Sequence, residues 1–217
     1  MPCPIKRISL CDFVFDIYEN VYEPAEDSFL LAENLDVKEG EQVLDIGSGC
    51  GILGVLAAKK ASSVLAVDLN PYAIRCTKHN STINQIGGKI NFVQASLFTA
   101  LSKGVTFSLI LFNAPYLPSD EDEDSSWIER AWMGGTNGRE LIDHFISEAP
   151  LYLKPDGRVL LMQSTITGLE KTLQKFTEQG LKAKVKAERK LPFFETLTLI
   201  EAKLNFRRNN LKAEPNS

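Results

Sequence analysis

The stretch Val43-Leu44-Asp45-Ile46-Gly47-Ser48-Gly49-Cys50-Gly51 joins an apolar run to a glycine-rich turn. The apolar run predicts a buried strand, and the glycines predict a sharp turn at the start of a helix. In α/β proteins such a turn lets a ligand approach the backbone closely. Gly49, Gly51 and Gly54 also satisfy a dinucleotide-binding pattern. A tight turn that holds no ligand is a third interpretation.

Asp45 separates these interpretations, because it places a carboxylate just before the turn. Phosphate binds to backbone amides at a helix N-terminus, and a neighbouring carboxylate repels it. A carboxylate at this point suits a cationic ligand with an amino group, such as S-adenosylmethionine. We therefore favour a methyl-donor site that includes Asp45, Gly47 and Gly49 over a dinucleotide site.

Strands and helices alternate along the chain around this turn. Apolar runs predict strands at residues 42–46, 63–67, 90–93, 107–112 and 157–162. Amphipathic patterns predict helices at residues 24–35, 51–60, 71–84, 138–153 and 169–179. Two antiparallel strands, 182–189 and 196–204, are expected to follow with no helix between them. This order predicts an α/β fold with a mainly parallel sheet covered on both faces. The closing pair of strands resembles the end of the seven-stranded, Rossmann-like sheet of class I methyltransferases.

Composition indicates an ordinary globular protein. The chain has 217 residues, 44% of them hydrophobic and 24% charged, with a net charge of −4. This balance excludes a disordered chain and a collagen-like fibre, and the negative charge argues against nucleic acid as the main partner. We expect residues 1–20 to be an N-terminal extension, residues 21–205 to form one methyltransferase domain, and residues 206–217 to be a polar tail.

The cysteines and histidines show no metal-binding spacing. The four cysteines lie at positions 3, 11, 50 and 76 with no C-x-x-C pair, and the two histidines are far apart. We therefore predict no metal site. The chain has no run of 18 apolar residues and no signal-peptide pattern at its start, so we expect no membrane contact and a cytoplasmic location.

Two further strand ends supply candidate donor-binding residues. Asp68 ends the second predicted strand, about 20 residues past the glycines, where an acidic side chain can accept hydrogen bonds from both ribose hydroxyls. Leu69 follows it. The alternative for Asp68 is an acid that caps the next helix. After the third strand, Ser96 can accept a hydrogen bond from an adenine amino group, and Leu97 can pack on the adenine face.

The sequence Asn113-Ala114-Pro115-Tyr116 follows the fourth strand. It resembles the N-P-P-Y signature of methyltransferases that act on planar amide or amino nitrogens, with alanine in place of the first proline. An amide nitrogen is a poor nucleophile, so the site must orient it. The Asn113 side-chain oxygen and the Ala114 backbone carbonyl can accept its two N–H groups. Pro115 holds residue 114 extended, and Tyr116 can pack against the planar group. A turn without chemistry is the alternative.

Motifs between residues 21 and 140 resemble the HemK-like release-factor glutamine methyltransferases in their short eukaryotic and archaeal form. They are Val21-Tyr22-Glu23-Pro24-Ala25-Glu26-Asp27-Ser28-Phe29-Leu30-Leu31, Ala131-Trp132-Met133-Gly134-Gly135 and Gly138-Arg139-Glu140. The resemblance implies methylation of the glutamine in the G-G-Q loop of a class I translation release factor, with S-adenosylmethionine as cofactor. It places donor-binding positions at Ser28, Asp45, Gly47, Asp68, Ser96, Leu97 and Asn113. Ser96 stands where relatives usually have aspartate.

The resemblance also implies a small zinc-binding activator protein as partner, which would add a strand beside residues 90–93. Two rival functions stay open. One is an adenine-specific nucleic-acid methyltransferase, although the chain offers no basic channel. The other is a non-catalytic subunit built on this fold. The acidic run at residues 120–124 is expected to be a solvated loop, with steering of a basic substrate as the alternative. Trp132 is expected to pack on the Gly134–Gly135 turn.

Overall fold

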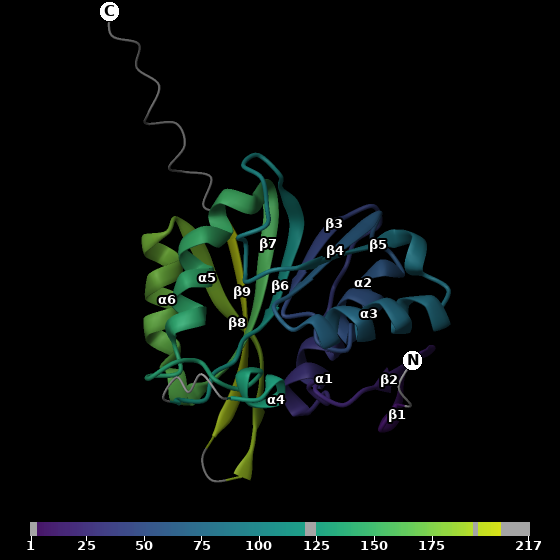
Figure 1. Ribbon diagram of the computed structural model, residues 1–217. Helices are drawn as coiled ribbons and strands as arrows, with labels where there is room; N and C mark the ends of the chain where they lie inside the picture. Colours follow the sequence, from purple (N-terminus) through teal and green to yellow (C-terminus); the bar gives the residue numbers. More distant parts are fainter. Residues whose placement is uncertain (1–3, 120–124, 193–194, 205–217) are drawn as a thin grey trace, which may run out of the picture.

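The computed structural model describes residues 4–119, 125–192 and 195–204 and contains a seven-stranded sheet in the order β5-β4-β3-β6-β7-β9-β8 (Figure 1). Its strands are β3 (Gln42–Ile46), β4 (Ser63–Asp68), β5 (Ile90–Gln94), β6 (Phe107–Asn113), β7 (Leu153–Ser164), β8 (Leu181–Lys190) and β9 (Thr196–Leu204). Only β9 runs antiparallel to its neighbours. The predicted mixed sheet with a closing antiparallel pair is confirmed.

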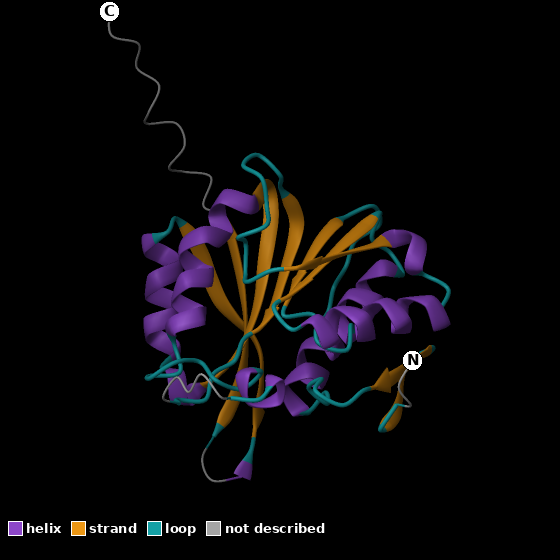
Figure 2. Ribbon diagram, in the orientation of Figure 1, coloured by secondary structure: helices purple, strands orange, loops and turns teal. Residues whose placement is uncertain are grey.

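Helices cover both faces of the sheet (Figure 2). One face carries α1 (Glu26–Glu33), α2 (Ile52–Ala58) and α3 (Pro71–Ile83), and the other carries α5 (Glu140–Glu148) and α6 (Leu169–Glu178). Side chains of β3 alternate between the two cores, with Val43 facing the first and Leu44 facing the second. Both residues are completely buried, as expected for a strand covered on two sides.

Most predicted elements differ from the structure by one or two residues at their ends, and the differences in three of them have a clear description. The helix expected at 138–153 is α5 followed by a short 3₁₀ segment, Ala149–Tyr152, because Pro150 cannot continue the α-helical hydrogen bonds. The strand expected at 157–162 begins earlier, at Leu153, and ends at Ser164. Pro24 precedes α1 instead of lying in its first turn. Two other 3₁₀ segments, Gly87–Lys89 and Thr165–Thr167, were not predicted.

A β-hairpin lies within the segment expected to be an N-terminal extension. Strands β1 (Lys6–Leu10) and β2 (Phe13–Ile17) pair antiparallel, and β2 packs against α3. Phe15 and Ile17 are completely buried in the first core. The backbone N–H groups of Val14 and Asp16 donate to the side-chain oxygens of Asn84 and Asn80, at the C-terminal end of α3, at 2.9 Å. These two side chains therefore satisfy backbone donors on the outer edge of β2. The residues of the hairpin therefore complete the first core.

The topology brings the carboxyl ends of β3, β4, β5 and β6 to one edge of the sheet, where parallel α/β folds bind ligands. The residues predicted for the donor and target sites follow these four strands. Among the helices of the described residues, none is long and apolar enough to cross a membrane.

Candidate functional site

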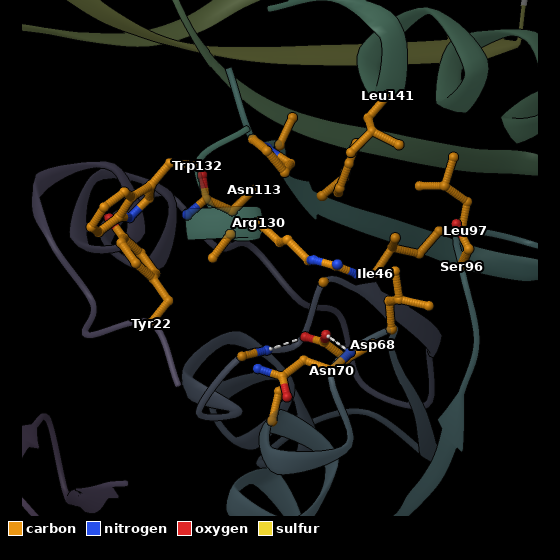
Figure 3. A pocket seen from close by; sticks show the side chains of 18 of the residues that line it. Tyr22, Ile46, Asp68, Asn70, Ser96, Leu97, Asn113, Arg130, Trp132 and Leu141 are labelled. Carbon is orange, nitrogen blue, oxygen red and sulfur yellow. Dashed lines mark hydrogen bonds between the residues drawn. The ribbon is translucent and has the colours of Figure 1, made fainter. Parts of the chain in front are cut away.

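One pocket at this edge brings together most of the predicted site residues (Figure 3). Its lining includes Gly47, Gly49, Asp68, Leu69, Ser96, Leu97, Asn113, Ala114, Pro115 and Tyr116. Ser28 and Asp45 do not line it. Most residues predicted to bind the donor therefore share a single cavity with the N-A-P-Y segment, as a methyl transfer between two molecules would require.

The glycine-rich turn is held in place by Asp68. Gly47 and Gly49 have φ values of +67° and +56°, which glycine adopts without strain. One carboxylate oxygen of Asp68 accepts the Gly49 N–H at 2.8 Å, and the other accepts the Asn70 N–H at 2.8 Å. Burial raises the pKa of Asp68, while these two backbone donors oppose the shift. Asn70, not Asp68, caps α3, since its side chain accepts the Tyr72 N–H.

Asp45 lies beneath the turn and faces α2. It is completely buried, and its Oδ2 accepts the Gly54 N–H at 2.9 Å. Within the described residues its Oδ1 has no hydrogen-bond partner. Burial raises the pKa of Asp45 to about 7. Asp45 does not line the pocket, and the expectation that its carboxylate faces a cationic ligand stays a prediction.

Ser96 and Leu97 form another wall of the pocket. Leu97 has a φ of +46° and is 6% exposed, so its apolar side chain is fixed in an unusual backbone conformation. The next residue, Phe98, stacks on Tyr152 with ring centres 4.8 Å apart and anchors the segment. Figure 3 shows Ser96 and Leu97 on the side of the cavity away from Trp132 and Tyr22.

Asn113 is oriented by a chain of hydrogen bonds that begins on α1. Its Nδ2 donates to Ser28 Oγ at 3.2 Å, and Ser28 Oγ lies 3.2 Å from Asp27 Oδ1. The Tyr22 hydroxyl donates to the same carboxylate at 3.1 Å. Asn113 Oδ1 is buried and, among the described residues, has no partner. A buried acceptor without a donor is costly, so this oxygen is suited to a donor that arrives with a ligand.

The rest of the N-A-P-Y segment lies beside this oxygen. Ala114 is 3% exposed, and its N–H donates to the Met162 carbonyl at 3.2 Å, which fixes the backbone next to β7. Tyr116 packs partly against both cores. Burial, followed by the charges of Asp27 and Glu195, raises the pKa of the Tyr116 hydroxyl. The ring is therefore neutral at physiological pH and suited to packing against a planar group.

The opening of the pocket is formed by residues that the sequence analysis did not assign to it. Tyr22, Trp127, Arg130 and Trp132 all line the cavity. Trp132 is 42% exposed, and its expected packing on the Gly134–Gly135 turn stays a prediction. Trp127 and Arg130 belong to α4 (Trp127–Arg130), a helix that was not predicted.

The signal for α4 was present in the sequence. Ser126 and Glu129 form a capping box, in which each side chain bonds to the backbone N–H of the other residue. The Ser-x-x-Glu spacing was readable at the residues that follow the acidic run. That run, residues 120–124, lies outside the described residues, as does the polar tail, so neither expectation is tested.

The described residues contain no group of three or more His, Cys, Asp or Glu side chains that could hold a metal ion. Cys50 and Cys76 are buried, and burial raises the pKa of both thiols, to about 12 for Cys76. Both are core residues. Cys11 is exposed instead.

Comparison with known proteins places this pocket in a family. Residues 24–131 match the family model described as the methyltransferase small domain. The chain is 42% identical over 185 residues to a putative protein N5-glutamine methyltransferase of Methanocaldococcus jannaschii, covering 84% of this chain and 92% of that protein. It is 33% identical over 175 residues to the methyltransferase HEMK2 of Homo sapiens, covering 76% and 81%.

A solved structure shares both the fold and the extent of the chain. It is the E. cuniculi Mtq2–Trm112 complex, described as responsible for the methylation of the eRF1 translation termination factor. The likeness has a TM-score of 0.69 at 25% identity and covers 86% of this chain and 99% of that one. With the fold, the pocket and these relatives in agreement, the chain belongs to the HemK-like protein N5-glutamine methyltransferases, in their short archaeal and eukaryotic form.

Proposed function

We propose that this protein transfers a methyl group from S-adenosylmethionine to the side-chain amide nitrogen of the glutamine in the G-G-Q loop of a class I translation release factor. The observation that carries the proposal is the Asn113 side chain, which lines the pocket and whose buried Oδ1 has no hydrogen-bond partner among the described residues. Relatives named release factor glutamine methyltransferases and an eRF1 methyltransferase catalytic subunit support the substrate.

The donor site fits the expected cofactor. The Asp68 carboxylate lines the pocket and is fixed by two backbone donors, so it is ready to accept the ribose hydroxyls. Gly47 and Gly49 leave the turn without side chains on the pocket side, and Leu97 offers an apolar surface for a flat ring. S-adenosylmethionine supplies an electrophilic methyl group on its sulfonium. Ser28 and Asp45 act on this site indirectly, through Asn113 and through the turn.

The target site works by orientation. Asn113 Oδ1 accepts one N–H of the glutamine amide and the Ala114 carbonyl accepts the other, which aims the nitrogen toward the donor side of the pocket. Pro115 and Tyr116 line the same cavity, and the Tyr116 ring packs against the planar amide and excludes water. When the donor is bound, the amide nitrogen would form a bond to the methyl carbon as the carbon–sulfur bond breaks, with S-adenosylhomocysteine as the leaving group, and would release one hydrogen as a proton.

The active form includes a small zinc-binding activator protein. The solved structure with the shared fold is a complex of two proteins, and β5 is the outermost strand of this sheet, where a partner can add a strand. The enzyme is expected to act in the cytoplasm, where release factors are found.

The test is methyl transfer to the cognate release factor with the activator present, mapped by mass spectrometry. One added methyl group on the G-G-Q glutamine is expected, and Asn113→Ala is expected to lose this product while it retains donor binding. Modification of an oligonucleotide adenine instead would favour the nucleic-acid alternative. A chain that binds no donor even with its partner would be a non-catalytic subunit. The net charge of −4 does not favour the nucleic-acid alternative.

A further inference from the structure

A second cavity lies along the face of α3 that is turned toward the end of β2. It has a volume of about 580 Å³, which falls in the range of small-molecule sites. Tyr18 and Glu19 line it from the segment after β2, and Tyr72, Arg75, Lys78 and His79 line it from α3. No residue that lines the donor pocket also lines this cavity. Figure 1 shows α3 above the β1–β2 hairpin, on the side of the molecule away from α5 and α6.

The cavity has a surplus of positive charge. Arg75 and Lys78 are exposed, and neither makes an ion pair within residues 4–119, 125–192 and 195–204. Glu19 is the single carboxylate among the residues that line the cavity. In a chain with a net charge of −4, two cations without an acidic partner at one concave site favour an anionic ligand.

Polar groups behind the cavity are satisfied without a ligand. Asp16 is 2% exposed, and its Oδ1 accepts a hydrogen bond from Arg7 Nε at 2.6 Å. Its other carboxylate oxygen, Oδ2, lies 2.9 Å from His79 Nε2. Its hydrogen bond with Arg7 is the main reason that the pKa of Asp16 is lowered. The charge of Asp16 is therefore neutralised inside the protein, and it does not cancel the charges of Arg75 and Lys78.

Two tyrosine rings give the cavity flat apolar walls. Tyr18 is 9% exposed and meets the His79 ring edge-on, with centres 5.5 Å apart. Tyr72 is 40% exposed, and the Arg75 guanidinium lies 5.7 Å from its ring centre. A planar ring beside a guanidinium matches a ligand that carries both a flat ring and an anion.

We propose that this cavity binds a nucleotide, with Arg75 and Lys78 on the phosphate and the tyrosine rings against the base. The same chemistry is offered by a free mononucleotide and by one nucleotide of an RNA chain. The acidic character of the whole protein favours the free mononucleotide, because a long polyanion would be repelled by the surrounding surface.

The test is isothermal titration of the full chain, saturated with S-adenosylhomocysteine so that the donor pocket cannot take an adenine ring. AMP, GMP, CMP and UMP are titrated separately, with inorganic phosphate and a short RNA oligonucleotide as comparisons. We expect saturable binding of at least one mononucleotide, one per chain. Arg75→Gln/Lys78→Gln is expected to weaken it at least tenfold, and Tyr72→Ala about fivefold.

The double variant Lys60→Gln/Lys171→Gln, which removes the same charge elsewhere, is expected to bind nucleotides like the parent protein. Unchanged binding of S-adenosylhomocysteine shows that each variant is folded. Absence of saturable nucleotide binding, or equal weakening in the control, overturns the proposal. Phosphate that binds as tightly as every nucleotide also overturns it. Much tighter, salt-sensitive binding of the oligonucleotide supports the nucleotide chemistry and identifies RNA as its source. None of these results depends on methyl transfer to a release factor.

Discussion

At the scale of single residues, Asp45 and Asp68 show how the end of a strand can give similar carboxylates different roles. Asp68 accepts two backbone N–H groups at 2.8 Å and lines the pocket, while Asp45 accepts one N–H from α2 and does not line the pocket. The first carboxylate is therefore suited to bind a ligand. The second carboxylate makes the stability of the fold depend on pH, because its pKa is raised where it bonds to α2.

Asp45 is expected to make the protein less stable as the pH rises from about 4 to 7. Burial raises its folded pKa from 3.8 to about 7, so in this window the folded state binds the proton and the unfolded state does not. The stabilising contribution is complete below pH 4 and is lost by pH 7, with a total on the order of a few kcal/mol. Asp45→Asn, which cannot ionise, should lack this loss.

The measurement is urea unfolding of both proteins, without donor, at several pH values between 4 and 8. The difference in unfolding free energy between the variant and the parent protein should grow in favour of the variant across this range. Parallel stability curves would show that Asp45 ionises normally.

Asp68→Ala is expected to weaken binding of S-adenosylmethionine at least tenfold, which corresponds to about 1.4 kcal/mol. The variant loses the acceptors for the ribose and also the two acceptors that fix Gly49 and Asn70. Calorimetric titration of donor into each protein measures the effect. Asp68→Asn keeps one acceptor oxygen, so its affinity for the donor should lie between those of the parent protein and Asp68→Ala. An unchanged affinity in Asp68→Ala would remove this residue from the site.

Ser28 is expected to act as a positioning residue for Asn113. Its hydroxyl accepts from Asn113 Nδ2 at 3.2 Å, so Ser28→Ala leaves the amide group free to rotate and its acceptor oxygen less well aimed. We expect kcat to fall about tenfold, the equivalent of one hydrogen bond near 1.4 kcal/mol, with little change in donor affinity. Ser28→Thr keeps the hydroxyl and should retain most of the rate. A loss confined to donor binding would instead place Ser28 in direct contact with the donor.

At the scale of elements, the glycine-rich turn depends on close contact between α2 and α3. Gly51 has a φ of +86°, and a Cβ on it would lie 2.7 Å from Thr77 Cγ2. Gly51→Ala is therefore expected to lower the unfolding free energy by about 2 kcal/mol, from left-handed strain and from this clash.

Thr77→Ser separates the two causes, because it removes Cγ2 but keeps the hydroxyl that donates to the Gly49 carbonyl at 3.0 Å. In chemical unfolding, Gly51→Ala/Thr77→Ser should be more stable than Gly51→Ala alone, although backbone strain remains. If the second substitution recovers nothing, the contact with Thr77 is not what selects glycine here.

The elements that the sequence predicted well are those with one dominant signal. Strand β3 was predicted to the residue because it is a short apolar run between polar residues. Helix α3 was predicted to within one residue, since Pro71 begins it and Asn84 is its C-cap. The hairpin β1–β2 was missed because its partners on α3, Asn80 and Asn84, lie more than 60 residues away. Local patterns do not report such contacts.

The candidate site was predictable where residues directly follow strands, since parallel strands bring their ends together. The orientation of a side chain was not predictable. Asp45 and Asp68 each lie within one residue of the end of a predicted strand, and only three-dimensional packing decides which of them lines the pocket. Trp127 and Arg130 were missed because a four-residue helix brings them to the opening from a distant loop.

At the scale of the whole molecule, the two edges of the sheet differ in the way expected if only one of them pairs with a partner. Edge strand β8 alternates charged and apolar residues, with Lys182, Lys184 and Lys186 on one side, and such lysines oppose strand addition. Edge strand β5, Ile90–Gln94, has the sequence INFVQ and carries no charge. Its backbone is therefore the one open to pairing.

We expect the activator protein to dock on β5 and to leave β8 unchanged. Pairing would place new hydrogen bonds on amides of Ile90–Gln94 and slow their exchange with solvent, while the lysine-lined edge gains none. Hydrogen–deuterium exchange measured by mass spectrometry, with and without the partner, compares both edges in one experiment, so β8 is the internal control. Protection at β8, or at neither edge in a complex that forms, would refute strand addition at β5. Protection confined to β5 would explain why this strand has no charged side chain that opposes strand addition. The partner would cover the edge that is exposed in the chain alone.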